Sequence, residues 1–175
     1  MDAAVAALDA AAVRAREREL AGILIDCVED GASVGFLPPL SLADATAYWR
    51  GVADAVADGS RIVLAAGAPG APMDGTVQLD LAMRPNGLHR AEVVRLLVHR
   101  RARRRGLGRL LMQAIEADAR RHGRTTLVLD TRQGDPSETL YRSLGWHFAG
   151  AIPRYARSAG GALDPSAFYY KILDA

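Results

Sequence analysis

The residues with the clearest chemical potential form a turn rich in arginine and glycine at positions 103–109, which reads Arg-Arg-Arg-Gly-Leu-Gly-Arg. An apolar segment precedes the turn and an amphipathic segment follows it. Glycine lets the backbone approach a bulky anion, and the free N–H groups at the start of a helix bind phosphate. The helix dipole and the arginines add positive potential at the same place. The turn therefore predicts a pyrophosphate site.

Two common nucleotide motifs fit this turn less well. Gly106 and Gly108 begin a Rossmann fingerprint, and Asp130 follows at about the distance of its ribose-binding acid. However, Leu111 replaces the third glycine, and the preceding strands read as hairpins instead of a βαβ series. A P-loop is excluded because the sequence has no Gly-Lys-Ser or Gly-Lys-Thr. The remaining candidate is a site for the pyrophosphate of an acyl-coenzyme A.

Two motifs resemble those of the GNAT N-acetyltransferase superfamily. Residues 103–108 match its coenzyme A motif, Arg/Gln-x-x-Gly-x-Gly/Ala, in every defined position. Residues 140–146 match its second motif, Leu-Tyr-x-x-x-Gly-aromatic. Arg100 stands where proline is usual, Arg104 where glycine is frequent, and Gly134 where many members have asparagine. Segments 31–36, 85–88 and 90–93 further resemble the tabtoxin-resistance group of this superfamily, which acetylates tabtoxinine-β-lactam.

The resemblance implies a fold, a cofactor and partners. The expected fold is α/β, a largely antiparallel mixed sheet with helices on both faces, in one domain at residues 1–175. The expected cofactor is acetyl-CoA, and the expected partners are a small-molecule acceptor and a second copy of the chain in a homodimer. The acceptor would be a toxin of that β-lactam type or an amino-acid-like metabolite.

The resemblance also implies a set of cofactor contacts. The strand before the turn is expected to bulge near Leu96, where a main-chain N–H would polarise the thioester carbonyl. The side chains of Arg100, Arg101 and Arg104 are expected to be solvated spectators. The residues predicted to bind the cofactor are Leu96, Leu97, Val98, Arg103, Arg104, Arg105, Gly106, Leu107, Gly108, Arg109 and Ser137.

Glu92 is the first candidate for catalysis, because it lies in the otherwise almost wholly apolar segment 91–98. An acid there is either a charge at a strand end or a general base whose ionisation is adjusted by partial burial. The surrounding residues resemble a strand of histone-acetylating GNAT enzymes, which implies the general-base role. Arg95 is expected on the opposite face of a regular strand, where it would not neutralise Glu92.

Two further side chains each have a structural and a catalytic interpretation. Tyr141 is either a core tyrosine or, as the resemblance implies, the general acid beside the coenzyme A sulfur. Asp130 either caps the segment after its strand or helps to position the amine of the acceptor. Cys27, the only cysteine, lies in an apolar setting that indicates an inert core thiol. Direct attack by the acceptor is therefore expected, without an acyl-enzyme.

The composition of the 175-residue chain argues against other classes of function. The net charge is only +2, and the basic cluster is local and lacks interleaved aromatic residues, so nucleic acid is not an expected partner. No apolar run approaches the ~20 residues of a membrane span, and no signal-peptide pattern is present. The cytoplasm is thus the expected location. The four histidines lack paired ligand spacing, so no metal is expected.

Elements placed around these residues follow from hydrophobic periodicity and turn signals. Alternating or continuous apolar segments predict strands at 61–66, 76–83, 91–98, 126–130, 146–152 and 167–173, and 5–8 is either a strand or the start of a helix. Helical spacing predicts helices at 10–30, 41–59, 107–122 and 137–144, and residues 153–165 are expected to form an irregular loop.

These observations predict an acetyl-CoA-dependent acetyltransferase acting on an amine or hydroxyl of a small molecule. Two alternatives stay open. One is an enzyme that uses another acyl-CoA. The other is a coenzyme A-binding regulatory module without activity, which the departures at Arg104 and Gly134 leave open.

Overall fold

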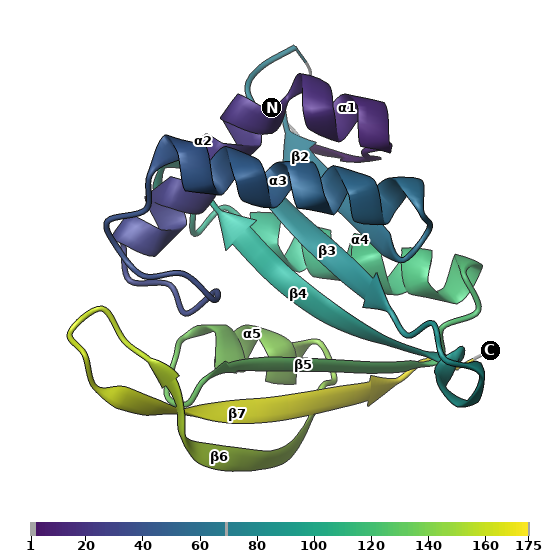
Figure 1. The fold of residues 1–175 in the computed structure, drawn as a ribbon. Helices are drawn as coiled ribbons and strands as arrows, with labels where there is room; N and C mark the ends of the chain where they lie inside the picture. The colour runs from purple at the N-terminus through teal and green to yellow at the C-terminus, as the bar shows by residue number, and fades with distance from the viewer. Residues whose placement is uncertain (1–2, 69, 175) are drawn as a thin grey trace.

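The computed structural model describes residues 3–68 and 70–174 (Figure 1). The strands are β1 (Ala4–Ala7), β2 (Arg61–Gly67), β3 (Gly75–Leu81), β4 (Arg90–Val98), β5 (Thr126–Arg132), β6 (His147–Arg157) and β7 (Leu163–Ile172). The helices are α1 (Ala10–Ala15), α2 (Glu17–Glu29), α3 (Leu42–Ala57), α4 (Leu107–Arg121) and α5 (Ser137–Ser143), with the 3-10 turns η1 (Pro85–Gly87) and η2 (Arg100–Ala102).

The seven strands form one sheet in the order β1-β2-β3-β4-β5-β7-β6. Every neighbouring pair is antiparallel except β4 and β5, which are parallel. The predicted mixed, largely antiparallel sheet is therefore confirmed. No helix among the described residues is long and apolar enough to cross a membrane.

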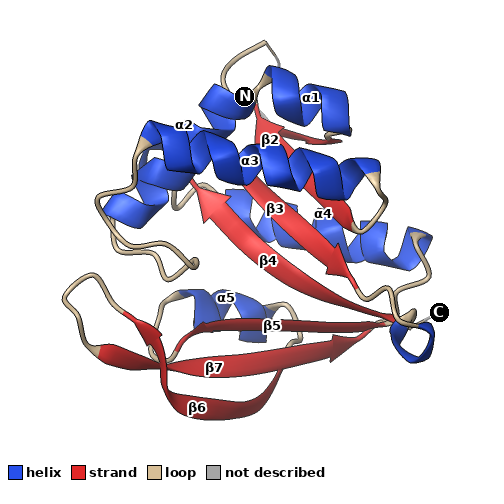
Figure 2. Cartoon of the chain, in the orientation of Figure 1, coloured by secondary structure: helices blue, strands red, loops and turns tan. Residues whose placement is uncertain are grey.

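Helices cover both faces of the sheet, as the sequence predicts (Figure 2). Alternation along β2 divides its side chains between two apolar clusters. Val63 and Ala65 pack in the cluster with α1, α2 and α3, whereas Leu64 and Ala66 pack in the cluster with α4. Tyr141 of α5 belongs to the second cluster, so α4 and α5 lie on the same face.

Local sequence signals account for where the helices begin. Ser41 caps α3, because its Oγ accepts a hydrogen bond of 3.0 Å from the backbone N–H of Asp44. Asp9 caps α1 in the same way and accepts from the N–H of Ala12 at 2.7 Å. Leu111, Met112, Ile115 and Ala119 are fully buried at helical spacing and dock α4 against the sheet.

The predicted helix at 10–30 is wrong in one respect, since it is broken at Arg16 into α1 and α2. Arg16 has φ −111° and ψ 17°, and its side chain holds Glu19 at 2.9 Å. The break lets α1 pack on α3 while α2 packs on both α3 and β4. The alanine-rich sequence carries no local stop signal there, so only the packing reveals the break.

The predicted loop at 153–165 is also wrong, because β6 and β7 extend through most of it. The two strands are joined by a turn in which the N–H of Ser158 donates to the carbonyl of Ala162 at 2.8 Å. Pro153 is tolerated because the pairing register shifts between Ile152 and Ala156, so its missing N–H breaks no regular ladder. Pro153 and Pro165 therefore led the sequence-based prediction to place a loop where most residues belong to strands.

Two features of β4 shape the middle of the sheet. One residue of β3, Val77, opposes two residues of β4, Arg95 and Leu96, and Arg95 has φ +53°. This β-bulge confirms the expected irregularity near Leu96. In addition, β4 pairs with β5 only as far as Glu92, opposite Val128. Beyond that point, no strand among the described residues pairs with this side of β4.

A buried acid ties α4 to the last two strands. Glu116 is 6% exposed and accepts hydrogen bonds from Trp146 Nε1 at 2.8 Å and from Lys171 Nζ at 2.7 Å. Lys171 also donates to the carbonyl of Leu144 at 2.6 Å. The ammonium and the carboxylate are both removed from water, so each depends on the other for compensation.

Replacing Glu116 with leucine should therefore lower the free energy of unfolding by about 3–5 kcal/mol, because Lys171 would remain buried without its counter-charge. Urea unfolding followed by circular dichroism measures the change. The double variant Glu116→Leu with Lys171→Met should recover most of the loss. A single variant with less than about 1 kcal/mol of destabilisation would contradict the assigned role of the pair.

Candidate active site

β4 and β5 part beyond Glu92 (Figure 1). A cleft opens at this point. It encloses a cavity of about 190 Å³, and its lining comes from β4, β5, α5 and the loop that precedes α3. Three of the predicted catalytic or positioning residues, Glu92, Asp130 and Tyr141, line this one cavity together with Leu96 and Ser137. The topology thus brings together side chains that are up to 49 positions apart in the sequence.

The carboxyl of Glu92 is exposed in the cleft, yet neighbouring protein atoms still desolvate it. This desolvation raises the pKa of Glu92, and the negative charges of Asp130 and Asp80 raise it further. Arg95 and Arg61 act in the opposite direction without reversing the shift. A carboxylate with a raised pKa is suited to accept a proton near neutral pH.

Arg95 lies on the cleft side of β4, so its predicted position on the opposite face is wrong. The bulge adds one residue to the strand and turns the side chain toward the same side as Glu92. Its guanidinium Cζ lies 5.8 Å from the ring centroid of Phe36 and 5.7 Å from that of Tyr48. A prediction based on regular alternation missed this residue, although an arginine within an apolar strand was the available signal.

Both interpretations of Tyr141 are compatible with its position. The ring is 7% exposed and packs between Trp146 and Tyr169, with centroid distances of 6.3 and 6.2 Å. The same residue lines the cleft. Burial raises the pKa of Tyr141 far above its usual value, with Asp135 adding to the shift and the Ser137 hydroxyl opposing it. The phenol therefore stays protonated throughout the physiological pH range.

Asp130 lies within β5, which continues to Arg132 and is longer than predicted. The capping interpretation of Asp130 is wrong, because Asp135 accepts the hydrogen bond from the N–H of Ser137 at 2.8 Å. Asp130 instead faces the cleft. The Ser137 hydroxyl pairs with that of Thr131 at 2.9 Å, which positions it at the cleft wall. Within the described residues, no three His, Cys, Asp or Glu side chains gather as metal ligands.

The arginine-glycine turn presents free backbone donors at the start of α4. Gly106 is the N-cap residue with φ +80°, and no side chain caps the helix. The first N–H groups of a helix have no intrahelical partner, so those of Leu107, Gly108 and Arg109 are available to an anion. The side chain of Leu107 is buried in the core, so this residue can contribute only its backbone. Arg104 adopts φ +60°, which explains why glycine is frequent there.

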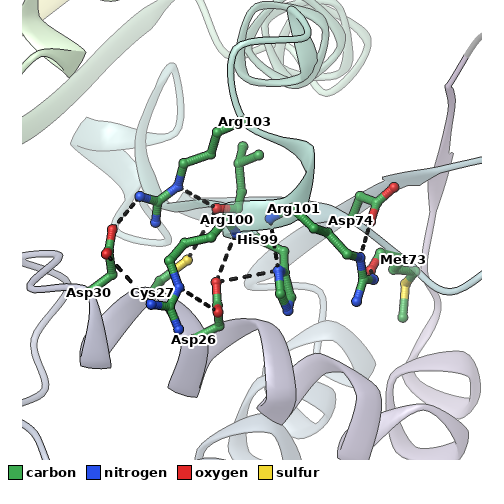
Figure 3. A network of polar contacts seen from close by, with 10 residues as sticks. Asp26, Cys27, Asp30, Met73, Asp74, His99, Arg100, Arg101 and Arg103 are labelled. Atoms are coloured by element: carbon green, nitrogen blue, oxygen red, sulfur yellow. Dashed lines mark hydrogen bonds and ion pairs between the residues drawn. The ribbon is translucent and has the colours of Figure 1, made fainter.

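Arg100 and Arg101 are tethers and not the solvated spectators that the sequence suggests (Figure 3). The backbone N–H and Nε of Arg100 donate to Asp26 of α2 at 2.9 and 2.8 Å. Arg101 Nε donates to Asp74 at 2.7 Å, and its Nη2 donates to the carbonyl of Met73. Burial alone would raise the pKa of Asp26, but the two hydrogen bonds from Arg100 hold this pKa below its usual value. The tethers fix the approach to the turn.

Arg103 is anchored as well (Figure 3). Its Nε donates to the carbonyl of Val98 at 3.0 Å, and its Nη1 donates to Asp30. The Sγ of Cys27 lies 3.6 Å from the same carbonyl, and burial raises the pKa of this thiol. The predicted core position of Cys27 is thereby confirmed. The aspartates that hold Arg100 and Arg103 lie 74 and 73 positions away, within α2 and at its C-cap, and no local sequence signal could have identified them.

These groups lie along one side of β4, and this stretch is called the channel beside β4. On the side opposite β3, residues 93–98 have no strand partner among the described residues, and the N-terminus of α4 offers free N–H groups. The exposed side chains of Arg104, Arg105 and Arg109 flank that terminus. A long ligand with amides at one end and a pyrophosphate at the other would form hydrogen bonds with both sets of groups. Coenzyme A has this structure.

Comparison with known proteins identifies the family. The sequence matches the Acetyltransferase (GNAT) family over residues 5–146. The chain belongs to this family. Enzymes of the GNAT family transfer an acetyl group from acetyl-CoA, so the match agrees with the channel beside β4.

Solved structures share the fold at low sequence identity. An N-acetyltransferase from Staphylococcus aureus Mu50 aligns with a TM-score of 0.82 at 16% identity, over 99% of this chain and all of that chain. The yncA protein of Salmonella typhimurium, solved with its cofactor acetyl-CoA, aligns with a TM-score of 0.80 at 20% identity, over 100% and 96%. The ribosomal-protein-alanine N-acetyltransferase of Brucella melitensis aligns with a TM-score of 0.77 at 24% identity, over 97% and 99%.

Substituting Gly108 with valine should weaken coenzyme A binding by about tenfold or more, because a branched side chain holds the backbone N–H groups away from the pyrophosphate. A Cβ at this position would lie 3.4 Å from Leu140 Cδ2, so the fold can accept it. Isothermal titration calorimetry measures the affinity. Gly22→Val is the matched control, because Gly22 lies in α2, outside the turn, with open space around it. Unchanged affinity in Gly108→Val would remove the turn from the binding site.

Proposed function

We propose that this GNAT enzyme acts in the cytoplasm and transfers the acetyl group of acetyl-CoA to an amine, or a hydroxyl, of a small molecule. The acceptor attacks directly, with Glu92 as general base and Tyr141 as general acid. The observation that carries the proposal is the placement of both side chains in one cleft, beside the free side of β4. The raised pKa of Glu92 supports its role as the base.

Three parts of the chain are assigned to contacts with the acetyl donor. The backbone of Leu96, Leu97 and Val98 would align the pantetheine arm, and the N-terminus of α4 with Arg104, Arg105 and Arg109 would hold the pyrophosphate. Ser137 would contact the donor from α5. When bound, acetyl-CoA supplies an activated acetyl thioester.

Glu92 and Tyr141 divide the proton transfers between them. The Glu92 carboxylate takes a proton from the acceptor nitrogen, and the Tyr141 hydroxyl gives a proton to the sulfur that departs. The main-chain N–H at the Leu96 bulge would stabilise the carbonyl oxygen of the thioester. An acyl-enzyme through Cys27 is disfavoured, because that thiol is buried and its pKa is raised.

A small acceptor is supported by the volume of the cleft, which at about 190 Å³ suits a metabolite better than a protein surface. A tabtoxinine-β-lactam-like toxin and an amino-acid-like metabolite both meet this requirement. The homodimer expected for the chain is supported by large apolar side chains that β6 and β7 expose, namely Phe148, Ile152, Tyr155, Leu163, Tyr170 and Ile172.

Glu92→Gln should lower turnover by about 100-fold or more at neutral pH, with little change in acetyl-CoA affinity, because only the proton acceptor is removed. A thiol-release assay with a panel of amines, amino acids and β-lactam toxins provides the rates. In the folded state the raised pKa makes ionised Glu92 unfavourable, so the variant should be no less stable than the parent at pH 7. Parental rates in Glu92→Gln would show that another group deprotonates the acceptor.

The pH profile gives a second measurement of the same assignment. A base is active only when ionised, so kcat/KM should fall as the pH drops through the raised pKa of Glu92. Because the charge of Asp130 helps to raise that pKa, Asp130→Asn should move the acidic limb to lower pH. An acidic limb that stays in place in Asp130→Asn would contradict the coupling between the two carboxylates.

Tyr141→Phe should reduce turnover by tenfold or more, since it removes only the hydroxyl and keeps the packed ring. The melting temperature should hardly change, because the ring contacts with Trp146 and Tyr169 remain. Steady-state rates and differential scanning calorimetry on the same preparation separate the two roles. Full activity with a clearly lower melting temperature would make Tyr141 a packing residue alone.

A further inference from the structure

Arg95 is a half-buried cation that the proposed chemistry does not use. Among residues 3–68 and 70–174, no carboxylate forms an ion pair with it and no group accepts a hydrogen bond from it. Its Nε is fully buried and lacks a partner. A guanidinium withdrawn from water in this way normally requires an anion or several acceptors. The unmet requirement points to a ligand.

The surrounding residues hold the guanidinium in a fixed position. Phe36 and Tyr48 flank it, and their rings contact each other edge-to-face at a centroid distance of 5.2 Å. Gly35 lies against its end, where a Cβ would come within 2.8 Å of Nη2. The lack of a side chain at Gly35, in the loop before α3, therefore leaves room for the guanidinium.

The backbone of Arg95 is strained in support of this placement. Its φ of +53° is unfavourable for a residue with a long side chain, and it accompanies the bulge. Strain of this kind persists where surrounding structure enforces it, and it clusters at binding sites. The bulge turns Arg95 into the cleft, whereas regular alternation would have placed it on the other face.

The charge pattern of the cavity is asymmetric. Arg95 is the one cation among the described lining residues, whereas Glu92, Asp130 and Asp135 are acids. Two nearby arginines are committed elsewhere: Arg61 pairs with Asp80 at 2.8 Å, and Arg132 pairs with Asp164 at 3.1 Å. An acceptor that enters this cavity therefore meets acids suited to its amine and one unpaired guanidinium.

We propose that Arg95 binds a carboxylate of the acceptor, so that the substrates of this enzyme are primary amines that also carry a carboxylate, as amino acids do. The planar guanidinium matches a carboxylate with two parallel hydrogen bonds. The acids of the cavity receive the amine while Arg95 fixes the other end. This inference rests on the proposed acetyl transfer and adds the chemical class of the acceptor.

The test compares acceptors that differ only by a carboxylate. The pairs are L-methionine with 3-(methylthio)propylamine, L-phenylalanine with 2-phenylethylamine, and L-lysine with cadaverine. For at least one pair, the parent should prefer the amino acid by about tenfold or more in kcat/KM, since the carboxylate contributes a charge-assisted contact. Arg95→Met should abolish that preference, so that the ratio of kcat/KM values within each pair falls to about one. Arg95→Lys should retain part of the preference, because it keeps the charge without the fork.

Controls separate the possible failures. Arg18→Gln, on an exposed part of α2, should leave every ratio unchanged. Binding of the same pairs to the protein loaded with coenzyme A, measured by calorimetry, provides a readout that needs no turnover. A parent with no preference for amino acids in either measurement would overturn the proposal, and so would an equal loss with both members of a pair in Arg95→Met. Failure of the proposed function is distinct, since coenzyme A would then not bind or no acceptor of any kind would be acetylated.

Discussion

Backbone N–H and C=O groups need partners, and β4 leaves residues 93–98 without a strand beside them on the side that faces β5. The arrangement of the candidate active site depends on this requirement for hydrogen-bond partners. The parallel pairing of β4 with β5 stops at Glu92, which places an acid at the point where the strands part. The unpaired strand then leads directly into the turn at the start of α4. One interruption of the sheet thus creates the cleft and exposes the side of β4 that we propose binds the donor.

The position of the turn is controlled by electrostatic contacts with α2. Arg100 and Arg103 pair with Asp26 and Asp30, which are spaced to lie on one side of that helix. These contacts connect the helical layer on one face of the sheet to the N-terminus of α4 on the other. They also commit Arg103 to the protein, so the arginines that follow it supply the charge available to a ligand. The high arginine content of the turn therefore serves two separate purposes.

The sequence was informative where local patterns determine the structure. Periodicity and turn residues located six of the seven strands and most helices, whereas residues 5–8 were left open between a strand and the start of a helix. The spacing of residues 103–108 predicted a turn before a helix, and the structure has this turn at the N-terminus of α4. The errors came from long-range effects. The face of Arg95 depends on a bulge against β3, and the break at Arg16 depends on packing against α3. The tethers of Arg100 and Arg103 join positions more than 70 residues apart. Local patterns contain no information about such contacts.

In the proposed binding mode, the channel beside β4 recognises coenzyme A mainly through main-chain groups, and this has a consequence for how such a chain can evolve. A backbone N–H is present whatever side chain a residue carries, with proline as the exception. Apart from Arg95 and Gly108, positions along residues 93–98 and in the first turn of α4 can therefore accept mutations as long as the backbone path is kept. Positions that impose that path, such as Gly106 with its positive φ, tolerate far less. Selection would then preserve the backbone conformation while the amino-acid sequence changes, and this accounts for the low identity of proteins that share the fold.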